Sequence, residues 1–186
     1  MIRADAVDRL SAAGWTALRG YGVRTIVDLR NDDERVESAE LPDGVDVVHV
    51  PLDRLDEDPD FWDEWMHGPQ FATPLYYAPF LERFPHSLDE ALDAIEAARP
   101  GGVVFHCVGG RDRTGLVAIA VLAAAGVAPE TIADDYVLAA ERAHTYDPAL
   151  EEFLAERGTS ARALVIELAE RLEYDRPALR ARLVVQ

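Results

Sequence analysis

The stretch HCVGGRDRTG, residues 106–115, holds the side chains best suited to chemistry. It contains Cys107, the one cysteine of the sequence, followed by a pair of glycines and, six positions later, by Arg113. A cysteine thiolate is a strong nucleophile, and the planar fork of an arginine can hold two oxygens of a phosphoryl group. The spacing therefore predicts covalent phosphoryl transfer, in which Cys107 attacks phosphorus and Arg113 holds the phosphoryl oxygens.

The backbone between these two residues is suited to bind an anion. This cysteine loop, residues 107–113, follows a predicted strand and leads into a predicted helix, so its N–H groups can converge at the positive end of the helix dipole. The glycines allow the backbone to approach an oxyanion closely, and the same field favours the thiolate form of Cys107. We expect the Thr114 hydroxyl to donate to that thiolate. The residues expected to bind substrate are Val108, Gly109, Gly110, Arg111 and Thr114.

Three apolar segments rich in β-branched residues predict the strands that lead to this loop. They are residues 24–29, 45–50 and 102–107, bounded by glycine, proline or aspartate. Helical patterns alternate with them, which is typical of an α/β fold. We predict a central, mostly parallel sheet of about four strands flanked by helices, with the cysteine loop between a central strand and a buried helix.

The helices are predicted from apolar periodicity and from their end signals. Residues 87–101 contain a capping-box pattern, Ser87 with Glu90, and end at a Pro-Gly pair. Residues 114–126 are apolar on nearly every side, which indicates a helix in the middle of the fold. From Pro129 onward, prolines at first turns and a glycine break predict about four helices that form a C-terminal layer.

The aromatic segment, residues 53–84, has four prolines and 8 of the 15 aromatic residues. Connections of this length often act as lids or binding loops; the alternative is a small helical cap whose rings fill its own core. We predict a single domain, residues 1–186, with this segment as a lid or cap insertion. The rings could line a pocket for a phenyl phosphate or could simply pack. The lid candidates are Asp53, Tyr76, Tyr77 and Phe80.

The motif resembles the signature of the cysteine-based tyrosine phosphatase superfamily, and its Gly-x-Asp-Arg-Thr-Gly ending is similar to the bacterial branch with tyrosine and often phosphoinositide phosphatase activity. The similarity extends to residues 10–35, which carry an Asp-Leu-Arg motif followed by a glutamate, and to GVAPETIADDYVLA after the buried helix. It covers roughly residues 3–140. Where the family commonly has a lysine before the motif's aspartate, this chain has Arg111.

The resemblance implies an enzyme that hydrolyses phosphotyrosine-type phosphomonoesters through a phosphocysteine, with neither metal nor cofactor. It also implies that Asp112 protonates the leaving group, because the chain has no Trp-Pro-Asp loop. The competing acids are Asp53, Asp56 and Asp58, which a closing lid could bring to the site. The alternative role for Asp112 is to orient Arg113 or a neighbouring loop.

Three further residues are expected to support the cysteine loop. The side chain of His106 should point to the face of its strand opposite Cys107, where it can bond the loop backbone. Asp28 and Arg30 end a predicted strand near the expected ligand edge of the sheet. We expect them to form a salt bridge that braces the loop, with direct contact to substrate as the alternative. The acidic runs NDDER and LDEDPD are interpreted as solvated surface.

The composition restricts the possible partners. The 18 basic residues are all arginine and stand against 35 acidic ones, which leaves a net charge of −17 and disfavours nucleic acids and anionic membranes. No apolar stretch approaches the roughly 18 residues of a membrane span, and the histidines lack metal-site spacing. We expect a cytoplasmic protein that binds a phosphorylated protein or a small phosphomonoester. The oligomeric state stays open.

Several alternative functions share this kind of loop. A phosphoinositide or dual-specificity phosphatase would use the same machinery on another substrate. A pseudophosphatase would capture a phosphorylated partner without turnover. Rhodaneses and arsenate reductases also use a cysteine loop; the Cys-to-Arg spacing disfavours the first, and the single cysteine disfavours the second.

Overall fold

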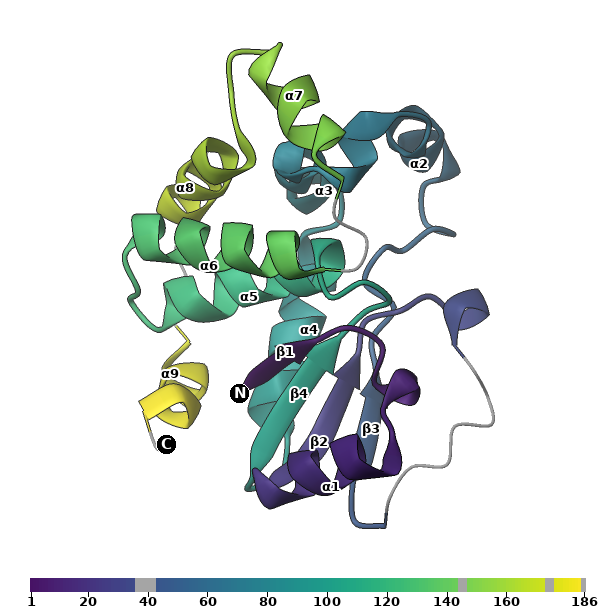
Figure 1. Cartoon of the computed structure of the whole chain (residues 1–186), viewed down its shortest axis with the longest axis vertical. Helices are drawn as coiled ribbons and strands as arrows, with labels where there is room; N and C mark the ends of the chain where they lie inside the picture. Colours follow the sequence, from purple (N-terminus) through teal and green to yellow (C-terminus); the bar gives the residue numbers. More distant parts are fainter. Residues whose placement is uncertain (36–42, 144–146, 173–175, 185–186) are drawn as a thin grey trace.

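The computed structural model describes residues 1–35, 43–143, 147–172 and 176–184. In these residues a four-stranded sheet, with every pairing parallel, has the order β1-β4-β2-β3 (Figure 1). The strands are β1 (Ile2–Ala4), β2 (Val23–Asp28), β3 (Asp46–His49) and β4 (Gly102–His106). The predicted α/β class and parallel sheet are thus confirmed.

The two faces of the sheet are covered by different helices. Because side chains alternate along a strand, Ile26 and Val104 pack on the face of α1 (Ala12–Gly20), while Val27, Val103 and Phe105 join the larger core on the other face. That larger core includes α4 (Pro85–Ala97) and α5 (Asp112–Ala124). Burial on both faces explains why β4 is a nearly continuous apolar run and why every residue of β2 except Arg24 is buried.

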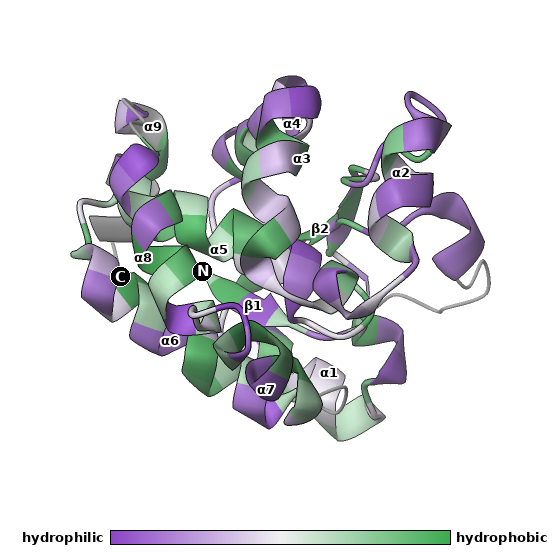
Figure 2. Cartoon of the chain, turned by 90° about the horizontal axis from the view of Figure 1, so that it is seen from above, coloured by the Kyte–Doolittle hydropathy of each residue, from purple (hydrophilic) through white to green (hydrophobic). Residues whose placement is uncertain are grey.

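The helix α5 lies in the middle of the fold, as its apolar sequence predicts. Nine of its residues are buried, and Figure 2 shows it as mostly hydrophobic between more polar helices. The predicted C-terminal layer is also confirmed. It consists of α6 (Pro129–Arg142), α7 (Ala149–Ala155), α8 (Ala161–Arg171) and α9 (Pro177–Val184).

Two local expectations differ from the structure. The strand β1 is absent from the predicted strands, because a three-residue edge strand is too short for a periodic signal. The capping box at Ser87 and Glu90 is wrong: α4 already begins at Pro85, and the buried Ser87 hydroxyl donates to the carbonyl oxygen of Leu52. Ser87 therefore joins α4 to the segment after β3 instead of starting the helix.

The aromatic segment folds into short helices that share one core. Trp62 stacks on Phe84, with 6.1 Å between ring centroids, and lies 5.9 Å from Phe80. This agrees with the cap alternative, in which the rings pack against each other. Among the described residues, no helix is long and apolar enough to cross a membrane. The elements of the segment are α2 (Pro59–Met66), η3 (Pro69–Ala72), η4 (Pro74–Tyr76) and α3 (Tyr77–Arg83).

Candidate active site

The strand register brings the candidate residues to one edge of the sheet. Asp28 at the end of β2 is paired with His106 at the end of β4 and with His49 at the end of β3. The segments that follow these three parallel strands therefore leave the sheet side by side, as is usual for ligand sites in α/β folds. Glu34 follows β2, Asp53 follows β3, and the cysteine loop follows β4.

The cysteine loop is a tight turn between β4 and α5. Cys107 is buried, and the Thr114 hydroxyl donates to its sulfur, with 3.1 Å between Oγ1 and Sγ. Gly110 has a φ of +68°, a conformation that favours glycine. A Cβ atom at Gly110 would lie 2.8 Å from the carbonyl oxygen of Ala4, so only glycine fits here without a shift.

Arg113 extends from the first turn of α5 to the segments after β2 and β3. Its Nη2 donates to Glu34 Oε1 across 2.7 Å, and its Nη1 donates to Glu34 Oε2. Nη1 also lies 3.2 Å from Asp53 Oδ2. Among the described residues, Nε of Arg113 has no hydrogen-bond partner, so this edge of the guanidinium group can receive an anion.

Asn31 links the two carboxylates that hold Arg113. Its side-chain amide donates to Asp53 Oδ2 at 3.0 Å, and its backbone N–H donates to Glu34 Oε2 at 2.8 Å. Asn31 precedes η2 (Asp32–Glu34) and forms a capping box with Glu34. The guanidinium group, two carboxylates and one amide therefore form a single network.

The pKa values of this network reflect burial and pairing. Burial raises the pKa of Glu34, but the hydrogen bonds from Arg113 outweigh this effect and lower the pKa overall. Burial raises the pKa of Asp53, and the attraction of Arg113 offsets the rise only in part. For Arg113, burial opposes the charged form, yet the bonds to Glu34 and the charge of Asp53 raise its pKa.

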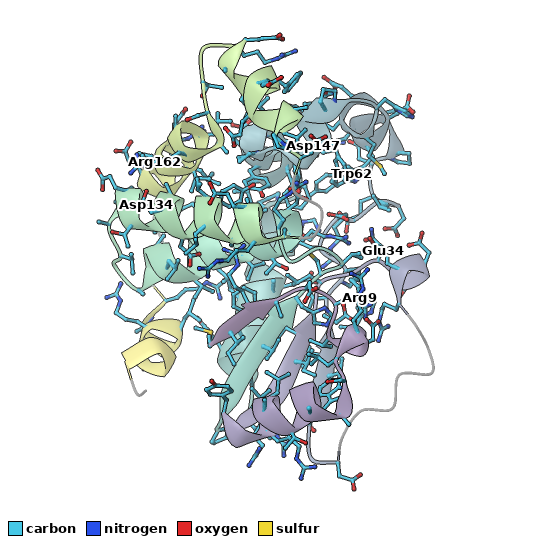
Figure 3. The ribbon with its side chains drawn as sticks, viewed as in Figure 1. Arg9, Glu34, Trp62, Asp134, Asp147 and Arg162 are labelled. Carbon is cyan, nitrogen blue, oxygen red and sulfur yellow. The ribbon has the colours of Figure 1, made fainter. Side chains whose placement is uncertain are left out.

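Glu34 and Asn31 are the residues that sequence reasoning missed. The acidic run NDDER was interpreted as solvated surface, which holds for the exposed Asp32 and Asp33 but not for Glu34. Figure 3 labels Glu34 on the segment that follows β2, near the carboxyl end of the sheet. The Asn-x-x-Glu capping box in this run was the available signal, because it fixes where the Glu34 side chain turns.

Asp28 and Arg30 form a buried ion pair beneath this network. Arg30 Nε and Nη2 donate to the two carboxylate oxygens of Asp28, each at 2.9 Å, and Nη1 donates to Asp8 at 2.6 Å. These bonds outweigh burial and raise the pKa of Arg30. Burial tends to raise the pKa of Asp28, but Arg30 and His106 lower it overall. Both side chains are occupied with protein partners.

His106 lies beside this pair with its Nδ1 on the loop backbone. Nδ1 is 3.0 Å from the carbonyl oxygen of Cys107, and because a carbonyl can only accept, Nδ1 carries the proton. Nε2 is 3.7 Å from Asp28 Oδ1. Burial lowers the pKa of His106, so the imidazole is neutral near pH 7.

Asp112 and Arg111 contact each other at the start of α5. The Nε of Arg111 lies 3.2 Å from Asp112 Oδ1, and its Nη2 lies 3.2 Å from Oδ2. The Asp112 side chain is 27% exposed, so solvent or a substrate can reach it. The buried Arg111 side chain thus contacts the carboxylate that is the candidate acid.

The other candidate acids and the rings have different surroundings. Asp58 caps α2 through the Phe61 N–H and pairs with Arg83, while Asp56 is exposed. The three lid-candidate rings are at most 2% exposed, which favours the alternative in which they pack in the core. The Tyr77 hydroxyl instead donates to the Asp112 carbonyl oxygen at 3.0 Å. The rings belong to Tyr76, Tyr77 and Phe80.

Comparison with known proteins adds independent information. The profile of the tyrosine phosphatase family matches residues 1–183. The triple specificity protein phosphatase PtpB of Mycobacterium tuberculosis is 30% identical, over 74% of this chain and 59% of that protein. A tyrosine-protein phosphatase of Nostoc commune is 29% identical, over 75% of this chain and 48% of that protein. The chain thus spans roughly half of the length of these curated relatives.

Proposed function

Because the chain belongs to the tyrosine phosphatase family, we propose that it hydrolyses phosphotyrosine-type phosphomonoesters through a phosphocysteine, without a metal ion. The observation that carries the proposal is the hydrogen bond from Thr114 Oγ1 to Cys107 Sγ, at the base of a loop that ends in Arg113. The hydroxyl thus donates to the sulfur atom that would attack phosphorus, and the thiolate is the form of cysteine that attacks.

In the first step, Cys107 Sγ forms a bond to phosphorus while the bond to the ester oxygen breaks. The backbone N–H groups of the loop and the Nε edge of Arg113 stabilise the charge on the equatorial oxygens. Glu34 holds the other edge of that guanidinium group, so the arginine is already oriented when substrate arrives. A carboxylic acid gives its proton to the departing oxygen, which leaves as a neutral alcohol or phenol.

In the second step, water attacks phosphorus and the phosphorus–sulfur bond breaks. The carboxylate that gave its proton takes one from the water, so inorganic phosphate leaves and the acid is restored. The Thr114 hydroxyl again donates to the sulfur as it departs. Each turnover consumes one water and needs no redox partner.

We propose that Asp112 is the acid that protonates the departing oxygen, with Asp53 as the alternative. Asp112 belongs to the first turn of α5 and is partly exposed, whereas Asp53 is buried against Arg113 and Asn31. The raised pKa of Asp53 would suit an acid, but its carboxylate is bound to Asn31 and Arg113. We therefore favour the partly exposed carboxylate of Asp112 as the group that a substrate can reach.

The first experiment measures release of phenol and phosphate from an aryl phosphate. Cys107→Ser should abolish turnover, EDTA should leave the wild-type rate unchanged, and rapid mixing should give a burst of phenol equal to the enzyme concentration. Normal turnover by Cys107→Ser would refute the phosphocysteine route. Phosphate binding without turnover in the wild type would indicate a pseudophosphatase instead.

The second experiment identifies the acid by varying the leaving group. Asp112→Asn should slow phenyl phosphate by about 10²–10⁴-fold, the usual contribution of acid catalysis. It should slow p-nitrophenyl phosphate far less, because nitrophenolate leaves without a proton. Asp53→Asn should slow both esters by the same factor. If only Asp53→Asn discriminates between the esters, the acid is Asp53.

The natural substrate is a separate question, since the M. tuberculosis relative is named as having triple specificity. We propose phosphotyrosine in a cytoplasmic protein, because the net charge of −17 disfavours anionic lipid surfaces. Rates on a phosphotyrosine peptide, a phosphoserine peptide and a soluble phosphoinositide decide between these substrates. A higher kcat/KM for the phosphoinositide would favour the lipid-phosphatase alternative.

A further inference from the structure

The residues that follow the chain start lie against the outer side of the cysteine loop. The Ala6 N–H donates to the carbonyl oxygen of Val108 at 3.1 Å. The Arg3 guanidinium group donates through Nη2 to the carbonyl oxygen of Gly110 at 3.2 Å. Two of the loop carbonyls are thus held by residues about 100 positions away in the sequence.

These bonds fix how the peptide groups of the loop are turned. A trans peptide is planar, with its C=O and N–H pointing in opposite directions, and no described peptide bond is cis. A carbonyl held on the outside therefore leaves the N–H of the next residue facing the inside. The bond at Val108 turns the Gly109 N–H inward, and the bond at Gly110 turns the Arg111 N–H inward.

A third carbonyl follows the same pattern. His106 Nδ1 lies on the Cys107 carbonyl oxygen, which leaves the Val108 N–H free to face the inside. Of these three external donors, one belongs to a neighbouring imidazole, one to a backbone amide and one to Arg3. Arg3 is the donor that a side-chain substitution in the N-terminal segment can remove.

Arg3 is itself held in place by α6. Its Nη1 donates to Asp135 Oδ2 at 2.8 Å, and the Arg3 side chain is 18% exposed. Arg3 lies on β1, which pairs with β4 so that Arg3 is opposite Phe105. The guanidinium group thus spans from the edge strand to α6 and reaches the loop from one side.

We propose that Arg3, oriented by Asp135, is a positioning residue that turns the Gly110–Arg111 peptide so that its N–H faces the bound phosphoryl group. The inference rests on the proposed function for its catalytic consequence, but its effect on anion binding does not depend on turnover. Arg3 does not touch the reacting atoms; it acts through the loop backbone.

A hollow beside Arg3 sets the expected size of the effect. It has a volume of about 440 Å³ and is lined by Arg3, Gly109, Gly110 and Asp135, among others. If Arg3 is shortened, water from this hollow can replace it at the Gly110 carbonyl oxygen. We therefore expect a partial loss of orientation, about tenfold in phosphate affinity, in the range of one hydrogen bond.

The test uses two readouts that do not require catalysis. The first is the pH midpoint of Cys107 alkylation by iodoacetamide, and the second is the concentration of inorganic phosphate that protects Cys107. Arg3→Ala should raise the midpoint and raise the protecting concentration about tenfold, with a parallel fall in kcat/KM. Arg3→Lys should give intermediate values, because one ammonium group can bond either Gly110 or Asp135 but lacks the fork.

The matched control is Arg162→Ala. Arg162 pairs with Asp134, the neighbour of Asp135 on α6, at 2.8 Å. Figure 3 labels Asp134 on α6 and Arg162 on the neighbouring α8. This variant removes an arginine ion pair from the same helix without contact to the loop, so both readouts should match the wild type.

A second variant removes the backbone donor, the N–H of Ala6. Ala6 has a φ of −55°, close to the value that proline imposes, so Ala6→Pro deletes the N–H that holds Val108. It should shift both readouts in the same direction as Arg3→Ala. Circular dichroism and thermal melting establish that each variant is folded; if Arg3→Ala is not, Arg3→Lys and Ala6→Pro provide the answer.

Unchanged alkylation and phosphate protection in the folded variants would overturn the proposal. An equal change in both readouts in Arg162→Ala would also overturn the proposal, since the effect would then follow from the loss of any arginine ion pair on α6 and not from the contact with the loop. A wild-type protein that binds phosphate at Cys107 but never turns over an aryl phosphate would refute the proposed function and leave the inference on Arg3 standing.

Discussion

The carboxylate of Glu34 accepts hydrogen bonds from both terminal nitrogens of Arg113, 79 positions away in the sequence. The contact joins the segment after β2 to the first turn of α5. It leaves Nε of Arg113 as the edge for an anion and makes the orientation of this arginine depend on η2.

Glu34→Gln tests that dependence. The amide keeps the size of the side chain but removes its charge and one acceptor, so Arg113 loses a charge-assisted pair. We expect kcat/KM on an aryl phosphate to fall about 10- to 100-fold, in line with roughly 1.5–3 kcal/mol for hydrogen bonds to charged groups. Asp33→Asn, in the same turn but exposed, should have no comparable effect. Equal losses in both variants would point to the turn itself rather than the pairing.

Thr114 offers a test of how the sulfur is stabilised. Thr114→Ala removes the donor to Cys107 Sγ, so the pH midpoint of Cys107 alkylation should rise and kcat should fall about tenfold. Thr114→Ser keeps the hydroxyl, so its alkylation midpoint and its kcat should both lie close to those of the wild type. If Thr114→Ser is as impaired as Thr114→Ala, the methyl group and packing at this fully buried position matter more than the hydrogen bond.

Gly110→Ala should destabilise the fold more than a glycine-to-alanine substitution at another position with a positive φ. The residue has a positive φ, and its new Cβ would meet the backbone of residues 4–5 at 2.8 Å. We expect a loss on the order of 2–4 kcal/mol in the free energy of unfolding, from strain plus collision, measured by urea denaturation. Gly126 also has a positive φ, +77°, but has open space around it. Gly126→Ala should therefore lower the free energy of unfolding by only about 1 kcal/mol. Similar losses would show that the close approach is unimportant.

The stability of the fold should depend on pH through His106. Burial lowers the pKa of His106 below its ordinary 6.5, so just below pH 6.5 the unfolded chain binds a proton that the folded chain does not. The free energy of unfolding therefore falls as the pH drops through this window.

His106→Asn isolates this contribution. The asparagine amide can still donate to the Cys107 carbonyl oxygen but does not titrate. Urea unfolding at pH 7.5 and pH 5.5 should show a smaller loss of stability in His106→Asn than in the wild type. An identical loss would assign the pH dependence to other groups, such as the buried carboxylates.

The elements that could be predicted from the sequence are those whose pattern lies within one short stretch of the chain. The strand, cysteine loop and buried helix are contiguous from residue 102 to residue 126, and periodicity, glycines and helix ends describe such a unit without reference to distant residues. The C-terminal helices were recognisable for the same reason. The short strand β1 and the start of α4 were not, because three residues carry no period and Ser87 has a distant partner, Leu52.

The sequence by itself determined the chemistry proposed for this protein: a thiol, a glycine-containing turn and an arginine at fixed spacing occur in one stretch, since their geometry follows from one strand-to-helix connection. Only the tertiary structure decided what orients them. The order β1-β4-β2-β3 places the ends of the strands next to each other, so Glu34 and Asp53 meet Arg113, and Arg3 meets Gly110. Such contacts depend on how strands are arranged in space, which no local pattern encodes.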